Sequence, residues 1–343
     1  MEKRKIPAVR FKGFEDDWEQ RKLGEVLDDM YNGQTPSRNK SEYWNGNIKW
    51  LSSGELNRGT VYDSIEMITE DGQKSANLRI VPKGTFIMAI TGLEAAGTRG
   101  NCALLGFDTT LNQSCMALFP KKDLLTSDFL FQWYRKVGEE YGLNYTQGTK
   151  QQSYNAELIK ILPISLPLVT EQKKIASYLS NIDHLITLHQ RKLEKLQLVK
   201  KSMLEKMFPK NGSKIPEIRF EGFADDWEQC KLSDVLDDMY NGQTPSRNKS
   251  EYWNGNIKWL SSGELNRGTV YDSIEMITED GQKSANLRIV PKGTFIMAIT
   301  GLEAAGTRGN CALLGFDTTL NQSCMALFPK KDLLTSDFCI SMV

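Results

Sequence analysis

Residues 170–207 read TEQKKIASYLSNIDHLITLHQRKLEKLQLVKKSMLEKM, a stretch that contains neither Gly nor Pro. Thr170 is a suitable N-cap and Glu171 suits a first helical turn, while Pro209 follows the last helical residue. About 37 helical residues at ~1.5 Å each predict a rod roughly 55 Å long. A helix of this length needs a packing partner along its apolar side.

A spacing of four and three residues selects one stripe along this helix, and eight of its ten positions are apolar. Such a heptad seam predicts packing against another long helix. The polar positions His189 and Lys200 are suited to setting the register of that pairing. Because His184 and His189 are five residues apart, they share no helix face, and we expect no metal site. The apolar seam consists of Ile175, Leu179, Ile182, Ile186, Leu193, Leu196, Met203 and Met207.

The sequence before the helix is repeated after it. Residues 26–129 are identical to residues 235–338, at a constant offset of 209. Because solenoid repeats are only about 20–50 residues long, the repeated unit is a whole domain with its connector. The predicted domains are 1–168, the helix 169–210, a linker 211–216, and 217–343 as an incomplete copy of 8–134. A duplicated domain is suited to binding a two-part target or to closing a symmetric assembly.

The two copies diverge after Phe338. The first copy continues LFQWYR at residues 130–135, whereas the second reads CISMV at residues 339–343. One inserted base converts codons for LFQWYR into codons for CISMV and a stop, so we expect a frameshifted form of a longer two-module protein. Unrelated sequence after a break is the alternative. The core of the second copy should be open on one side, because several apolar segments have lost their partners.

Composition is that of a globular protein, with 40% hydrophobic and 25% charged residues and a formal net charge of zero. The sequence has no run of 18 apolar residues and no signal peptide, and its six cysteines form no CxxC pair, so we expect a reduced, cytoplasmic protein without a membrane span. Residues 170–210 carry a net charge of +5. DNA binding would therefore use a local face.

The local pattern of the first module predicts a mixed α/β domain. We expect a short helix or turn over residues 16–27, an exposed turn over 70–74 and a helix from Phe129. Strands are expected at residues 48–51, 84–90, 101–105, 114–120 and 159–167.

Catalytic motifs are missing from the sequence. The glycine turn at residues 92–99 has Thr98 where a phosphate loop requires Lys, and no GxSxG, HExxH or GxGxxG motif occurs. Both histidines lie on the long helix, so the globular domains contain no histidine that could act in catalysis. We therefore expect no enzyme activity, no cofactor and no metal in this chain.

Four polar loops of the first module are rich in groups that hydrogen-bond phosphates and base edges, although each alone is also an ordinary surface loop. Tyr43, Trp44 and Trp50 could be base platforms, but core packing is the favoured interpretation. The DNA-binding candidates are Thr35, Ser37, Arg38, Asn39, Lys40, Ser52, Ser53, Asn57, Arg58, Arg99, Gln147, Thr149, Lys150 and Gln151, with Thr244, Arg247, Lys249 and Arg267 in the second copy.

The order of globular domain, long helix, linker and second domain resembles the specificity subunit of type I restriction-modification systems. Residues 162–167 (LPISLP) and 171–183 (EQKKIASYLSNID) are similar to the start of the family's spacer helix. Residues 192–196 (KLEKL) and 200–209 are similar to its end, and residues 215–220 (IPEIRF) to the entry of a second recognition domain. The resemblance covers the chain except its last five residues.

This resemblance implies α/β (mixed α+β) target recognition domains joined by a long coiled-coil-forming α-helix. It implies that each domain reads half of a split double-stranded DNA site, while modification subunits methylate adenine and restriction subunits translocate and cleave DNA. Unlike a typical family member, this chain has two nearly identical recognition domains, so the expected site is palindromic with a central gap.

Two outcomes stay open for the incomplete second copy. Either it cannot fold and the fragment is inactive, or the first module forms a homodimer through the long helix. A dimerisation scaffold is a competing function. Loss of DNA binding after substitution of Arg38, Arg58, Arg99 and Lys150, with folding intact, would reject it. A third candidate function is a self-sufficient methyltransferase or nuclease. The absence of cofactor and catalytic motifs argues against it.

Overall fold

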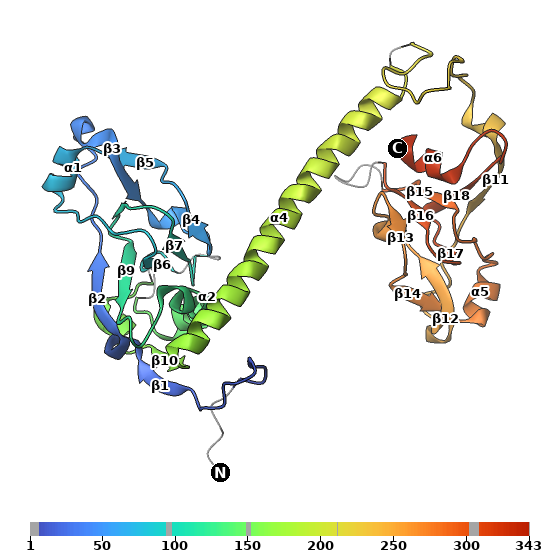
Figure 1. The fold of residues 1–343 in the computed structure, drawn as a ribbon. Coiled ribbons are helices and arrows are strands. Elements are labelled where there is room, and N and C mark those ends of the chain that lie inside the picture. The colour runs from blue at the N-terminus through green and yellow to red at the C-terminus, as the bar shows by residue number, and fades with distance from the viewer. Residues whose placement is uncertain (1–6, 94–97, 149–151, 211, 302–308, 343) are drawn as a thin grey trace. The chain divides into compact units, whose positions relative to one another are not determined.

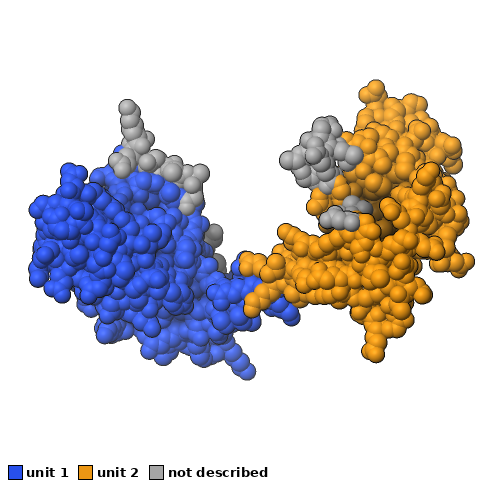
Figure 2. All heavy atoms as spheres, turned by 90° about the horizontal axis from the view of Figure 1, so that it is seen from above, with its two compact units in different colours: residues 1–192 blue, residues 193–343 orange. Residues whose placement is uncertain are grey.

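The computed structural model describes residues 7–93, 98–148, 152–210, 212–301 and 309–342. Two compact units divide within the long helix, unit 1 at residues 1–192 and unit 2 at residues 193–343 (Figure 2). The domain boundaries at residues 168, 210 and 216 stay predictions.

Unit 1 contains a five-stranded and a three-stranded sheet (Figure 1), together with a two-stranded sheet of β1 (Glu19–Lys22) and β10 (Pro163–Leu166). In the larger sheet β4 pairs parallel with β7, while the other neighbours are antiparallel. Its strands, in spatial order, are β2 (Leu27–Asn32), β9 (Cys115–Pro120), β6 (Phe86–Ala89), β7 (Cys102–Leu105) and β4 (Thr60–Val61). The smaller sheet has the order β5 (Glu66–Ile68), β3 (Trp44–Leu51) and β8 (Thr110–Leu111). The strands expected at residues 48–51, 84–90, 101–105 and 114–120 are therefore confirmed.

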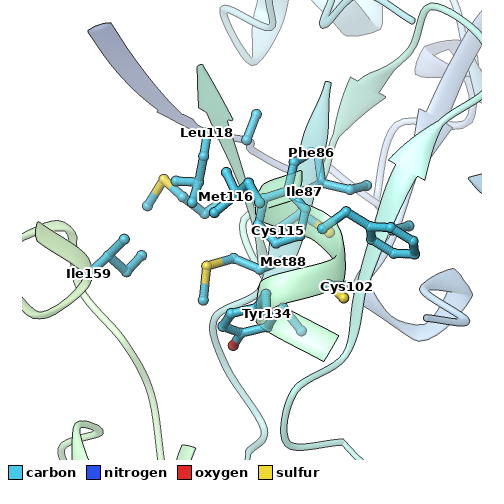
Figure 3. Packing of buried hydrophobic residues seen from close by; sticks show 14 of the residues in the cluster. Phe86, Ile87, Met88, Cys102, Cys115, Met116, Leu118, Tyr134 and Ile159 are labelled. Carbon is cyan, nitrogen blue, oxygen red and sulfur yellow. The ribbon is translucent and has the colours of Figure 1, made fainter. Parts of the chain in front are cut away.

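The helices of unit 1 are α1 (Glu70–Ser75), α2 (Ser127–Asn144), α3 (Ala156–Lys160) and the start of α4 (Val169–Met207). Helix α1 packs on β3 of the smaller sheet, whereas α2 packs on β6 and β7 of the larger sheet. One apolar core joins the larger sheet to α2 and α3, and Figure 3 shows part of it, including Tyr134 of α2 and Ile159 of α3. The predicted mixed α/β fold with one long helix is confirmed.

Three local predictions differ from the structure. The short helix or turn expected over residues 16–27 is confirmed only for the 3₁₀ helix η1 (Leu23–Val26), because strand β1 (Glu19–Lys22) precedes it and pairs antiparallel with β10 (Pro163–Leu166). The strand expected at residues 159–167 begins only at Pro163, because the Asn155 side chain caps α3 by accepting a hydrogen bond from the Leu158 amide at 2.8 Å. The turn expected at residues 70–74 is helix α1, capped by Thr69.

The long helix begins at Val169, one residue before the expected N-cap, so Thr170 lies inside its first turn. The Leu168 carbonyl accepts hydrogen bonds from the amides of Glu171 and Gln172 at 2.8 and 2.9 Å. The Glu171 carboxylate is fully buried and receives two hydrogen bonds from the Arg10 guanidinium at 2.7 and 2.8 Å. These contacts attach the start of α4 to the N-terminal segment.

Unit 2 repeats the five-stranded and the three-stranded sheet with the same strand order. The two outcomes expected for the second copy stay predictions. Its large sheet runs β11 (Leu236–Asn241), β18 (Cys324–Pro329), β15 (Phe295–Ala298), β16 (Cys311–Leu314) and β13 (Thr269–Val270). Its small sheet runs β14 (Glu275–Ile277), β12 (Trp253–Leu260) and β17 (Thr319–Leu320), and its short helices are α5 (Glu279–Ser284) and α6 (Ser336–Met342).

The core of unit 2 is less complete around the large sheet. Its buried residues form two separate clusters there, whereas unit 1 has one. The small sheets keep the same core in both units, with Trp50, Ile68 and Leu78 matched by Trp259, Ile277 and Leu287. The opening expected in the second copy lies around the large sheet, where Leu232 and Leu333 are exposed while their counterparts Leu23 and Leu124 are buried and half-buried.

Candidate nucleic-acid interface

Arg38 is held against the small sheet of unit 1. Its guanidinium donates to both carboxylate oxygens of Glu66 on β5, at 2.8 Å for the Nη2 contact, and lies 3.7 Å from the ring centre of Trp44. The hydrogen bond from Arg38 lowers the pKa of Glu66 and, reciprocally, raises the pKa of Arg38. The Arg38 side chain is about half exposed, so a phosphate can still approach its outer edge.

The aromatic residues beside this loop pack against one another. Trp50 is buried, donates its Nε1 hydrogen to the Gln34 carbonyl at 3.0 Å and meets Trp44 edge to face at 5.2 Å. For Trp50 the core interpretation is therefore confirmed. Tyr43 accepts a hydrogen bond from the Lys40 ammonium at 2.9 Å, which positions Lys40 at the exposed tip of the loop beside exposed Ser37 and Asn39.

Arg58 and Arg99 belong to a second group, near the start of β7. The Arg58 guanidinium donates to the Arg99 carbonyl at 2.5 Å and reaches the Glu139 carboxylate of α2 at 3.5 Å. Arg99 donates to the Gln152 side-chain oxygen at 3.3 and 3.4 Å. The contacts thus divide the predicted cations into a group at Arg38 and Lys40 and a group at Arg58 and Arg99.

Several predicted contact residues have local structural roles. Ser52 and Glu55 form a capping box at the 3₁₀ helix η3 (Ser53–Glu55), which includes the half-buried candidate Ser53. The Asn57 side chain accepts from the Gly59 amide at 2.9 Å, and the Thr35 hydroxyl donates to Gln113. These bonds shape the loops and leave fewer groups for DNA.

Gln147 lies on an exposed turn, where its backbone exchanges two hydrogen bonds of 3.0 Å with Ser153. Thr149, Lys150 and Gln151 lie outside the described residues.

The second copy reproduces the first group of contacts. Arg247 donates to Glu275 and lies 3.8 Å from the ring centre of Trp253, and Lys249 donates to Tyr252 at 3.0 Å. Thr244 donates to Gln322, as Thr35 does to Gln113. Arg267 keeps the left-handed backbone of Arg58, with φ of 58° and 57° respectively. Any DNA contact made by the Arg38 loop is therefore available twice.

One exposed cation was missed by sequence analysis. Arg79 donates to Asp29 at 2.8 Å, and its guanidinium lies 4.5 and 4.6 Å from the ring centres of Tyr31 and Phe119. Asp29 and Tyr31 are two residues apart on β2, so their side chains lie on the same face of the strand. This spacing could have indicated a surface site from the sequence. The pairing of β2 with β9, which adds Phe119, is not visible in the local sequence.

The long helix exposes most of its predicted seam. Only Glu171, Gln172 and Ala176 of α4 are buried. The seam residues Leu179, Ile182, Ile186, Leu193, Leu196 and Met203 are exposed, while Ile175 packs on the core of unit 1 and Met207 is half-buried. Leu185, Leu188 and Val199 are also exposed, so the apolar surface is wider than a heptad seam.

Within the described ranges, no three or more His, Cys, Asp or Glu side chains are grouped so that they could hold a metal ion. Among the same residues, no helix combines the length and the apolar character needed to cross a membrane.

The comparisons with known proteins agree on one protein family. The family model described as "Type I restriction modification DNA specificity domain" matches residues 15–198 and 224–341. The type I restriction enzyme MjaIX specificity subunit of Methanocaldococcus jannaschii is 26% identical over 313 residues, covering 86% of this chain and 68% of the relative. The EcoR124I/EcoR124II specificity subunit of Escherichia coli is 28% identical over 183 residues, covering 52% of this chain and 43% of the relative.

The fold agrees with that assignment. A crystal structure of a type I restriction-modification S subunit from M. genitalium superposes with a TM-score of 0.60 at 14% identity, covering 98% of this chain and 78% of the other. Because the family model covers most of both copies and the first part of the helix between them, the chain belongs to the type I restriction-modification specificity family and carries two of its domains.

Proposed function

We propose that this chain is the DNA-reading subunit of a type I restriction-modification complex, in which each recognition domain binds one half of a split double-stranded site. The observation that carries the proposal is the duplicated Arg38 loop, whose side chains have the same partners in both copies. In this proposal partner modification subunits methylate adenine, partner restriction subunits cleave DNA, and the chain itself supplies no catalysis.

The proposed site is an inverted repeat with a central gap. Residues 26–129 and 235–338 are identical, so two such domains have the same base preference. Two identical readers related by a twofold axis contact half-sites of inverted sequence, as in dimeric DNA-binding proteins. The distance between the readers then sets the length of the gap.

The proposed assembly uses the exposed side of α4. A stripe containing Ile186 and Leu193 would pair with the same helix of a second chain, which gives a homodimer. The additional exposed Leu185, Leu188 and Val199 widen the apolar surface beyond one helix–helix seam. A modification subunit is the proposed occupant of that remaining surface.

The proposal is tested by expressing the chain with its modification subunit and mapping adenine methylation across a genome. A gapped palindromic motif is expected. Lys40→Ala and Lys249→Ala form a matched pair, since each ammonium donates to a tyrosine hydroxyl at 2.9 or 3.0 Å. Each should weaken DNA binding at all sequences and lower the salt slope by about 1 if its lysine contacts a phosphate. Lys74→Ala, on the exposed side of α1, is the control.

Three outcomes separate the versions of the proposal. Loss of methylation with both variants supports two active readers in one chain. Loss with Lys40→Ala alone supports a homodimer that reads through unit 1 only. No methylated motif and no DNA binding by a folded complex would reject DNA recognition.

A dimerisation scaffold is the second candidate, favoured by the exposed apolar stripe of α4. Ile186→Asp with Leu193→Asp should convert a dimer to monomers in sedimentation. Thr187→Asp, which points away from the stripe, should leave the dimer intact. If the dimer forms but never binds DNA, the scaffold is the better account.

A further inference from the structure

Identical residues are covered differently in the two copies. Leu23 of η1 is fully buried, whereas Leu232 at the same position is 44% exposed. Val26 is buried and Val235 half-buried, and Met239 is 53% exposed where Met30 is half-buried. The more complete cover in unit 1 comes from a segment that packs on this face.

The segment that covers the face is known from unit 1. It consists of residues 152–168, which include α3 and β10. The Leu162 carbonyl accepts a hydrogen bond from the Leu23 amide at 2.8 Å, and β10 pairs with β1 over four residues. Ile159 and Leu162 are fully buried against the core. Met30 lies in the same shallow pocket as Ala156 and Lys160.

Unit 2 presents the matching half of this packing. Residues 228–231, all described, correspond to β1 but belong to no strand. Their backbone is a potential sheet edge for an added strand, which is a common mode of peptide recognition. Beside it, Leu232 and Met239 offer exposed apolar surface.

Three residues differ between the segments 19–25 and 228–234, namely Arg21/Cys230, Gly24/Ser233 and Glu25/Asp234, and the change at Gly24 faces the covering segment directly. A Cβ atom placed on Gly24 would lie 2.8 Å from the Cβ and 2.9 Å from the Cγ of Lys160. Unit 2 has Ser233 at this position. A segment seated as in unit 1 must therefore shift away from Ser233, because contacts this short are repulsive.

We propose that the exposed face of unit 2 formed by residues 228–231, Leu232, Val235 and Met239 binds, in trans, a segment with the pattern of residues 152–168 from a second polypeptide. The bound segment adds a strand along residues 228–231 and places a short apolar helix over η4 (Leu232–Val235). Ser233 limits how closely that helix approaches. This proposal rests on the packing of the two copies and is independent of DNA recognition.

The test uses the whole chain and a labelled synthetic peptide of residues 152–168, with binding followed by fluorescence anisotropy. Saturable binding is expected, and Ser233→Gly in the chain should tighten it by ~10-fold, because that change removes the overlap with Lys160. Because Ser233→Gly is a gain-of-binding variant, a folding defect cannot imitate the expected result. A peptide with Ile159→Asp and Leu162→Asp is the control, and it should not bind.

The location of binding is checked separately. Met239→Lys, at an exposed position, should abolish peptide binding without changing the fold. Hydrogen exchange should slow in fragments covering residues 213–235, whose sequence is unique to the second copy. Absence of binding to both the natural chain and Ser233→Gly would overturn the proposal, as would binding that Met239→Lys leaves unchanged. Equal affinity for the two chains would overturn the role of Ser233.

Discussion

Leu23 and Leu232 stand at the same position of two nearly identical domains, and replacing each by alanine should destabilise its own unit by a different amount. Leu23 is fully buried beneath α3 and β10, whereas Leu232 is 44% exposed. The pair therefore measures how much residues 152–168 contribute to the core. Leu23→Ala should lower the free energy of unfolding of unit 1 far more than Leu232→Ala lowers that of unit 2.

The magnitude follows from transfer and cavity terms. A Leu→Ala change removes three carbons, which at about 0.8 kcal/mol each give about 2.4 kcal/mol for a buried side chain. The closed cavity left at Leu23 raises the loss to about 3 kcal/mol or more. At Leu232 roughly half of the transfer term applies and the site opens to solvent, so we expect about 1 kcal/mol. The expected difference is about 2 kcal/mol.

Native-state hydrogen exchange in the whole chain can resolve the two losses. Residues 26–129 and 235–338 give indistinguishable fragments, so each unit is followed through a unique segment. Fragments covering residues 130–146 report on unit 1, and fragments covering residues 213–235 report on unit 2. Losses that agree within about 0.5 kcal/mol would refute the reasoning, because the cover seen in unit 1 would then contribute nothing.

Three further predictions concern charge, thiol reactivity and backbone contact. The pKa of Glu66 is lowered by its hydrogen bond from Arg38, so this pair should stabilise unit 1 above pH ~4.3 and cease to do so as the pH falls through the lowered value. Glu66→Gln should therefore flatten the acid limb of a denaturation series; an unchanged limb would contradict this. Burial raises the pKa of Cys102 to about 12, so a thiol reagent at pH 8 should modify exposed Cys230 first, as peptide mapping would show. Gly138→Ala would place a Cβ 2.7 Å from a backbone atom of the loop before β7, and should lower the denaturation midpoint of unit 1.

Much of the fold was predictable because its signals are local. The absence of Gly and Pro between residues 170 and 207 predicted α4, and short apolar runs predicted β6, β7 and β9. The polar loops were also predictable as surface features. Which of their side chains remain available for DNA was not, because Arg38 and Arg58 find their partners Glu66 and Glu139 on elements distant in sequence.

The short helix or turn expected over residues 16–27 was wrong for residues 19–22, for a related reason. Residues 19–22 read EQRK, which carries no strand signal of its own. They form β1 because the edge of β10 supplies hydrogen-bonding partners from residues 163–166. Sequence reasoning could not see this pairing, which joins segments more than 140 residues apart.

The duplication shows, within one chain, which features the local sequence determines and which depend on tertiary contacts. The sequence by itself determined where the repeated strands lie along the chain, the α4 rod and its apolar stripe, since these depend on local periodicity. Only tertiary structure decided whether residues 19–22 or 228–231 form a strand, and whether Leu23 or Leu232 is buried. The physical reason is that a strand needs a paired edge and a core residue needs a cover, and both are supplied by distant parts of a chain.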